Sequence, residues 1–179
     1  MKIFAVYSRL NFIKKPEWLD AFRIKYGYPY TYHVTLKQPT YVQEGEILKV
    51  KDILEDLFRE LKFPEHKIGI VFDKLVIDTP IMIVATKAKE MAVLQTKIVK
   101  ALEGYNNFVN PVSKDWEEDF SPHITISDDL NVEKLEQAKL DLGEDVRCEA
   151  VVEEIVLTVA QDMTSAEDSK DKTVYKLRD

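Results

Sequence analysis

The chain has 179 residues, of which 45% are hydrophobic and 32% charged, so its composition is that of an ordinary globular protein and excludes a largely disordered one. Its formal net charge of -7 argues against binding an extended nucleic acid duplex, which needs many Lys and Arg contacts to phosphates, but is compatible with a nucleotide or an oligonucleotide end. The single Cys148 excludes an intramolecular disulfide, and no apolar run approaches the roughly 20 residues of a membrane span. We therefore expect a cytoplasmic protein without membrane contact, and we expect a monomer.

The first third of the chain is predicted to form a strand, a helix, a second strand and a long helix. Residues 3–8 are a nearly continuous apolar run, which is typical of a central strand. Pro16 suits the first position of a helix, which Gly27 ends. The second strand is expected to end where the chain turns after Pro39. Residues 45–61 carry apolar side chains at helical spacing and predict an amphipathic helix.

The middle of the chain predicts two strands, a helix and a loop. Residues 67–77 and 81–86 have strand character, and residues 78–80 form the turn between them. Residues 88–102 have apolar side chains at helical spacing. Residues 105–119 are rich in Asn and acidic residues and are predicted to be a loop, which could form the rim or lid of a site.

The last part of the chain predicts a helix and two further strands. Asn131 is a good N-cap for the helix. Residues 146–161 predict a long strand, and the alternation of its apolar side chains shifts near residues 153–154, which indicates a β-bulge. Residues 162–172 are expected to be a polar loop before a closing strand at residues 173–177.

A short motif occurs twice, as His33-Val34-Thr35-Leu36 and His123-Ile124-Thr125-Ile126. Successive side chains of a strand point to opposite faces, so His and Thr share one face and the apolar residues point to the core. The side chains expected to point away from the core are Thr31, His33, Thr35 and Lys37 in the first strand, and Ser121, His123, Thr125 and Ser127 in the second. The chain has only three histidines, and two of them occupy the same place in this motif.

Each motif begins a half of the chain, residues 33–87 and 123–177, and the two halves have equal length. Both are predicted to contain, in order, the motif strand, a helix, a strand, a turn and a strand. This order predicts an internal duplication within one domain that spans residues 1–179. Such a duplication can relate two lobes by an approximate two-fold axis, which would bring both histidines to a central cleft.

Two facing imidazoles and two hydroxyls suit the cleavage of a phosphodiester. A histidine with a pKa near 6.5 can accept or donate a proton near neutral pH. Cleavage requires one proton to leave the attacking oxygen and another to reach the leaving oxygen, on opposite sides of the phosphorus. The Thr hydroxyl two residues after each His can donate a hydrogen bond to a non-bridging oxygen.

On these two motifs, their separation and the order of elements, the chain resembles the two-histidine (2H) phosphoesterase superfamily, which includes RNA 2′,3′-cyclic phosphodiesterases and 2′-5′ RNA ligase-like proteins. The resemblance implies a bilobed, pseudo-two-fold α+β fold in which two mainly antiparallel sheets form a central cleft and helices pack outside. It implies hydrolysis without a metal or other cofactor. His33 and His123 would be acid and base, and Thr35 and Thr125 would bind the phosphate; we assign His123 as the base and His33 as the acid.

The sequence departs from this family after the second motif. Many RNA-processing members have a small residue and Arg there, whereas this chain has Ser127-Asp128-Asp129. Two acids stand where an anion-binding residue would be expected. The departure argues against a long RNA substrate and against a ligase-like reaction.

We therefore expect a phosphodiesterase that opens a 2′,3′-cyclic phosphate on a nucleotide or short RNA end. The alternatives are a phosphodiesterase for ADP-ribose cyclic phosphate or 2′-5′ oligonucleotides, and a non-catalytic nucleotide-binding relative. A metal site would need a third ligand. Neither His66, expected at the surface of a loop over residues 63–66, nor Cys148 has a recognisable ligand spacing, so we expect no metal.

Overall fold

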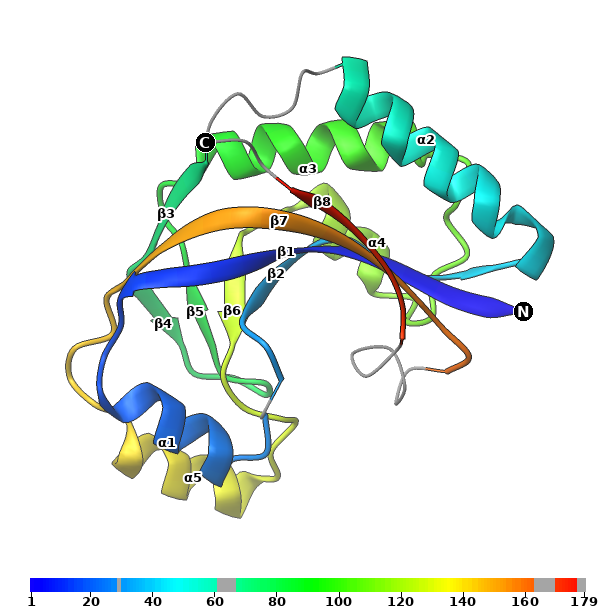
Figure 1. Ribbon diagram of the computed structural model, residues 1–179. Coiled ribbons are helices and arrows are strands. Elements are labelled where there is room, and N and C mark those ends of the chain that lie inside the picture. The colour runs from blue at the N-terminus through cyan, green and yellow to red at the C-terminus, as the bar shows by residue number, and fades with distance from the viewer. Residues whose placement is uncertain (29, 61–66, 163–169, 177–179) are drawn as a thin grey trace.

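The computed structural model describes residues 1–28, 30–60, 67–162 and 170–176, and it has a mixed α+β fold with two antiparallel sheets (Figure 1). This confirms the predicted α+β class. The large sheet has the strand order β2 (His33–Val42), β1 (Lys2–Lys14), β7 (Cys148–Ala160) and β3 (Ile68–Phe72). A fifth strand, β8 (Asp171–Lys176), also pairs with β7. The small sheet has the order β4, β5, β6, and these strands span Lys74–Val76, Met82–Val84 and His123–Thr125.

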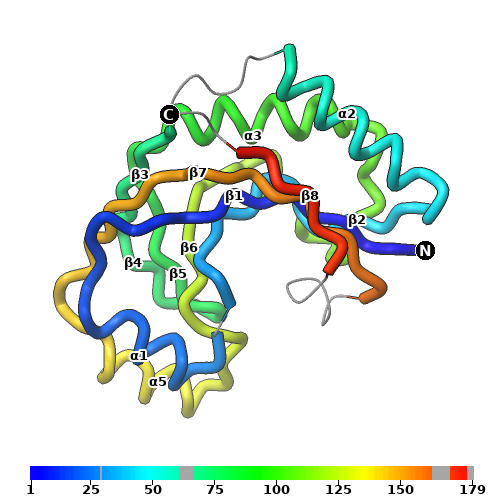
Figure 2. Tube along the Cα trace, in the orientation of Figure 1, coloured from blue at the N-terminus to red at the C-terminus, as the bar shows by residue number. Residues whose placement is uncertain are grey.

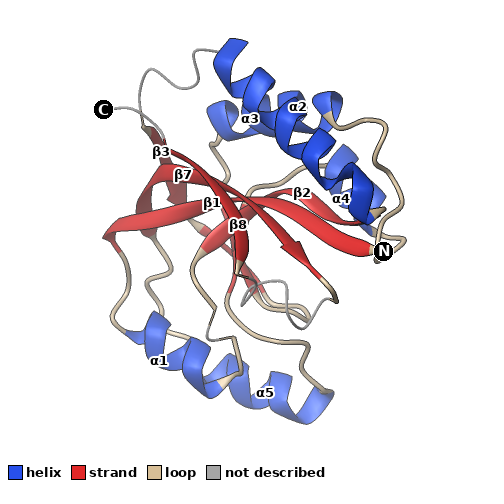
Figure 3. Ribbon diagram, turned by 45° about the vertical axis from the view of Figure 1, so that its right-hand side comes forward, coloured by secondary structure: helices blue, strands red, loops and turns tan. Residues whose placement is uncertain are grey.

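The helices lie in two groups. The helix α2 follows the short 3-10 helix η1 and contacts α3, and both lie over one face of the large sheet (Figures 1 and 3). The helices α1 and α5 lie side by side at the opposite end of the molecule, where Lys25 bonds to Asp141. The helices have the following bounds: α1 Trp18–Lys25, η1 Glu44–Glu46, α2 Ile47–Glu60, α3 Lys89–Ala101, α4 Ser113–Glu118 and α5 Val132–Asp141.

The core forms where the apolar faces of the helices meet the sheets. Val50 and Leu54 of α2 and Met91 and Ile98 of α3 are fully buried, as their helical spacing predicts. Each such side chain contributes roughly 1.5–3 kcal/mol by leaving water. Figure 2 shows β1 running beside β7 along most of its length, and this pair forms the centre of the large sheet.

The apolar residues of both motif strands point to the core, as predicted. Val34, Leu36, Ile124 and Ile126 are at most 1% exposed. Two residues that were predicted to lie on the opposite face, Lys37 and Ser127, are also buried. The Nζ atom of Lys37 lies 2.9 Å from a carboxylate oxygen of Glu117. Ser127 is buried because its Oγ accepts a hydrogen bond from the backbone N–H of Ile81, at 2.9 Å.

The strand β2 does not end at Pro39, as the sequence suggested, but continues to Val42. In β1, Phe4 pairs with Thr40 and Val6 pairs with Lys37, so the register shifts where Gln38 and Pro39 lie. A bulge on an edge strand tolerates Pro, which cannot donate a ladder hydrogen bond. The carbonyl of Pro39 accepts a hydrogen bond from the N–H of Val109 at 3.0 Å, so the outer edge of β2 is partly covered.

The region 105–119, predicted as a loop, contains the short helix α4, so that prediction is wrong in part. Two local predictions near the second motif are confirmed. The Asn131 side chain accepts a hydrogen bond from the N–H of Lys134 and caps α5. A bulge lies at Glu153, because Arg9 pairs with Glu154 and the next residue of β1 pairs with Val152.

Several predictions fall on residues that the structure does not describe. These are the loop at residues 63–66 with His66, the end of the helix at Leu61, part of the polar loop at 162–172, and the last residue of the closing strand, Leu177. The remainder of that strand, β8, is present. Among the described helices, none has the length and apolar character needed to cross a membrane.

Candidate functional site

The two motif strands are edge strands, and they contact each other. The strand β2, with His33, forms one edge of the large sheet, and β6, with His123, forms one edge of the small sheet. Their connections are alike: β2 pairs with β1 and β1 with β7, whereas β6 pairs with β5 and β5 with β4, all antiparallel. Each motif strand thus pairs with the strand that precedes it in the chain, and the topology places both histidines at the junction of the sheets.

Each histidine is held by the same local hydrogen bond. Nδ1 of His33 lies 2.8 Å from the carbonyl oxygen of Thr31, and Nδ1 of His123 lies 2.8 Å from the carbonyl oxygen of Ser121. A carbonyl oxygen can only accept, so these bonds assign the proton of the neutral ring to Nδ1. In this tautomer Nε2 is the ring nitrogen that can accept a proton in both residues.

Both rings are half-buried, and burial lowers the pKa of each histidine below 6.5, while the bond to the carbonyl opposes this shift. The pKa of His33 is lowered further by the charges of Arg23 and His123. The two imidazoles therefore lie close enough for the protonation of one to disfavour that of the other.

The threonines of the motifs share the faces of their histidines. Thr35 and Thr125 are half-buried, two residues after His33 and His123, and lie opposite Tyr7 and Met82 in the neighbouring strands. Directly opposite residues of an antiparallel pair point to the same face. The four predicted residues therefore lie on two strands that contact each other.

Two residues of β1 extend the site, and the sequence analysis did not identify them. The Tyr7 ring centroid lies 5.1 Å from that of His33. Arg9 lies directly opposite His33 and forms a 2.8 Å ion pair with Glu154 of β7. Positions 7 and 9 alternate with buried positions in β1. Which residues lie opposite them depends on the register between β1 and β2, which the sequence alone does not give.

Arg23 of α1 is only 5% exposed. Its guanidinium carbon is 3.6 Å from the centroid of the Tyr32 ring and 5.5 Å from that of Tyr28. One terminal nitrogen donates a hydrogen bond to the Tyr30 carbonyl. The alternating tyrosines before the first motif thus surround an arginine from the preceding helix.

The acidic segment after the second motif is explained by packing against the end of α1. The N–H of Asp128 donates a hydrogen bond to the Tyr26 carbonyl at 3.1 Å. The Asp128 carboxylate occupies the space beside Gly27, where a Cβ atom would lie only 2.6 Å from its Oδ2. Gly27 also has a φ of 85°, which few other residues adopt. Burial raises the pKa of Asp128, and the charge of Asp129 raises it further.

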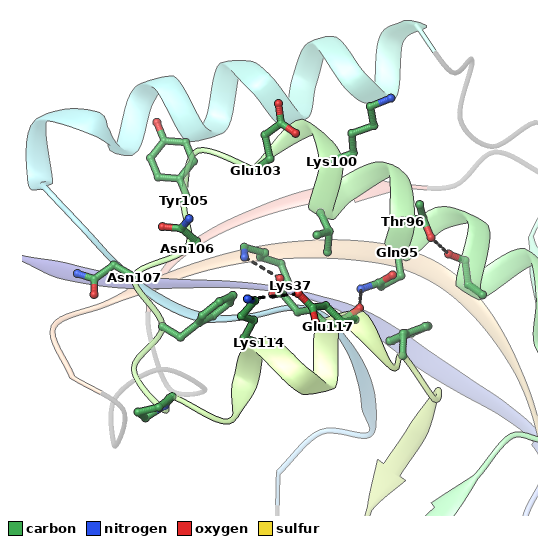
Figure 4. A pocket seen from close by; sticks show the side chains of 16 residues that line it. Lys37, Gln95, Thr96, Lys100, Glu103, Tyr105, Asn106, Asn107, Lys114 and Glu117 are labelled. Carbon is green, nitrogen blue, oxygen red and sulfur yellow. Dashed lines mark hydrogen bonds and ion pairs between the residues drawn. The ribbon is translucent and has the colours of Figure 1, made fainter.

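A cavity of about 1040 Å³ lies on another part of the molecule, between α3, α4 and residues 105–108 (Figure 4). Neither motif histidine lines it. Its wall includes the buried ion pair of Lys37 and Glu117, and Glu117 also accepts a hydrogen bond from the N–H of Gln38 at 2.7 Å. Phe108 covers the Lys37 ammonium at 4.4 Å from its ring centroid. The cavity is lined by Lys37 of β2 and by Phe120, which lies in the segment just before His123.

Comparison with known proteins finds no family model that matches the chain, and no curated protein that is significantly similar to it. Within the residues that the structure describes, no group of three or more His, Cys, Asp or Glu side chains is arranged to hold a metal ion.

Proposed function

We propose that the protein is a phosphodiesterase that opens a 2′,3′-cyclic phosphate on a nucleotide or short RNA end without a metal ion. The observation that carries this proposal is the matched pair of histidines, each with Nδ1 bonded to the carbonyl two residues earlier, on two edge strands in contact. In this proposal the two sheets belong to the two lobes of a 2H phosphoesterase fold, and the substrate binds between them. The enzyme would act as a cytoplasmic monomer.

In the proposed reaction Nε2 of one histidine removes a proton from water as the water oxygen bonds to phosphorus. The other histidine is an imidazolium that carries a second proton on Nε2, and it donates this proton to the ribose oxygen as the bond from that oxygen to phosphorus breaks. The product is a phosphomonoester, and the two histidines have exchanged protonation states. Thr35 and Thr125 donate hydrogen bonds to non-bridging oxygens, whose negative charge is concentrated in the transition state.

The charges around the histidines support an assignment of roles opposite to the one that we made from the sequence. Arg23 and His123 both lower the pKa of His33, whereas burial alone lowers the pKa of His123. Repulsion between the two histidines acts on both, so it is the charge of Arg23 that favours His123 as the site of a single shared proton. This supports His123 as the acid and His33 as the base.

The decisive experiment presents the full chain, treated with a chelator, with 2′,3′-cyclic nucleotides, ADP-ribose cyclic phosphate and 2′-5′ oligoadenylates, and identifies the products. We expect a cyclic nucleotide to be opened to a single phosphomonoester isomer. Preferred turnover of either other substrate would change the substrate assignment. Binding of a nucleotide with no turnover would favour a non-catalytic nucleotide-binding protein, and activity that requires an added divalent ion would contradict the metal-independent mechanism.

A further inference from the structure

The charge of Arg23 is poorly satisfied within the protein. Its side chain is 95% removed from solvent, and its Nε atom has no hydrogen-bond partner among the described residues. The nearby carboxylate of Asp20 already accepts hydrogen bonds from Lys15 and from the Tyr32 hydroxyl. A buried guanidinium without a bonded carboxylate is costly unless another anion completes its interactions.

The surroundings of Arg23 fix its orientation, and its charge acts on Asp20, where it adds to the lowering of the carboxyl pKa by the hydrogen bond from Lys15. The Tyr32 ring lies against the guanidinium at 3.6 Å, and the Tyr30 carbonyl accepts a hydrogen bond from one terminal nitrogen. Stacking on an aromatic face leaves the edge of the guanidinium plane for hydrogen bonds. This is the geometry in which Arg binds the oxygens of a phosphate.

Arg23 and His33 are anchored to neighbouring peptide units. Arg23 donates to the carbonyl of Tyr30, and His33 Nδ1 donates to the carbonyl of Thr31. Burial is the main cause of the lowered pKa of His33, and the charge of Arg23 contributes to it. The buried cation is therefore adjacent to the motif histidine of the large sheet.

We propose that Arg23 is the anion-binding residue of this site and takes a non-bridging oxygen of the substrate phosphate. This inference rests on the proposed function and assigns the charge that the segment after the second motif lacks, since Asp128 there packs against Gly27. Arg9 is already paired with Glu154, so Arg23 is the better placed cation. The substrate group at this position must carry a full negative charge.

The test measures the dissociation constant of inorganic phosphate for the full chain by calorimetry, in the wild type and in Arg23→Met. Loss of a charged hydrogen bond predicts affinity that is weaker by at least about tenfold in the variant. Lys25→Met is the matched control, because Lys25 is a cation of the same helix that is paired with Asp141 at the surface. We expect its phosphate affinity to equal that of the wild type.

A second comparison separates anion binding from a structural role. An uncharged nucleoside should bind the wild type and Arg23→Met equally well. Equal losses for phosphate and nucleoside, an unchanged phosphate affinity in Arg23→Met, or an equal loss in Lys25→Met would overturn the proposal. If Arg23→Met does not fold, Arg23→Lys decides: Lys cannot reproduce the planar fork, so phosphate affinity should fall several-fold with nucleoside binding retained. Unchanged phosphate affinity in Arg23→Lys would then overturn it.

The outcomes also distinguish this inference from the proposed function. If the substrate panel shows hydrolysis of a cyclic phosphate but Arg23→Met binds phosphate normally, only the role of Arg23 is wrong. If no substrate is hydrolysed but Arg23→Met loses phosphate binding selectively, the anion site stands and the proposed enzyme does not.

Discussion

The two motif strands have the same local hydrogen bond but very different surroundings. The strand β2 is ten residues long, lies in the large sheet and is tied to α4 through the ion pair of Lys37 with Glu117. The strand β6 has three residues and belongs to the three-stranded sheet. His33 is surrounded by Tyr7 and Arg23, whereas only burial lowers the pKa of His123. A repeated motif can thus retain its local geometry while its two copies acquire different electrostatics.

The largest expected effect removes either member of the histidine pair. His33→Ala and His123→Ala should each lower the turnover of the best substrate by roughly 10²–10⁴-fold, because each loses one proton transfer. Initial rates at saturating substrate measure the loss, and circular dichroism checks the fold. Thr96→Ala on α3 is a control, since its hydroxyl bonds only within its own helix. Near-normal turnover in either histidine variant would contradict the proposal that β2 and β6 each supply one catalytic histidine.

The next effect concerns the anchoring of β2. Glu117→Ala leaves the Lys37 ammonium, 2% exposed, without its carboxylate and should lower the free energy of unfolding by about 3–5 kcal/mol. Urea denaturation of the wild type and the variant measures this loss of unfolding free energy. Glu118→Ala is the matched control. The Glu118 side chain is 65% exposed and pairs with Lys114 at the surface, so this substitution should leave the free energy of unfolding nearly unchanged. Equal effects of the two substitutions would show that β2 does not depend on this ion pair.

The electrostatic difference between the histidines should appear in the pH dependence of stability. Both have a folded-state pKa below the unfolded value of 6.5, so the unfolded chain binds more protons between these values. Stability therefore rises with pH through this window, and the contribution is lost as the pH falls through 6.5 towards the folded pKa.

Because more charges act on His33, His33→Asn should remove more of this slope than His123→Asn. Unfolding free energies measured from pH 5 to 7.5 would test this. A larger change in His123→Asn would reverse our assignment of acid and base.

The smallest expected effect concerns Tyr7, whose ring contacts His33. Tyr7→Leu should lower kcat/KM about three- to tenfold, as expected for loss of an aromatic contact worth about 0.5–1.5 kcal/mol. Tyr41→Leu, on the same sheet but opposite Ile3, is the control and should leave kcat/KM unchanged. An effect of Tyr7→Leu no larger than that of the control would show that β1 only supports β2.

Features with a local physical cause could be predicted from the sequence. The apolar spacing of α2 and α3, the Asn131 cap and the parity shift at Glu153 each depend on a few adjacent residues. The four motif residues could be identified because the same short pattern occurs twice.

What could not be predicted depends on contacts between distant segments. The burial of Lys37 requires Glu117 on α4, a helix too short to give a clear period. The positions of Tyr7 and Arg9 relative to His33 require the register of β1 and β2. Arg23 belongs to α1, and only the tertiary fold places it among the tyrosines of the segment before His33.

The central position of β1 has a consequence for the order in which the protein folds. Its two neighbours are β2 and β7, and the latter begins only at Cys148. The strands of the small sheet, by contrast, are all complete by Thr125. During synthesis the small sheet can therefore assemble first. One edge of β1 stays unpaired until β7, its partner there, has been synthesised. Pairing across this separation closes a long loop and should be the slow step of folding, with an unpaired apolar strand as the species most prone to aggregate.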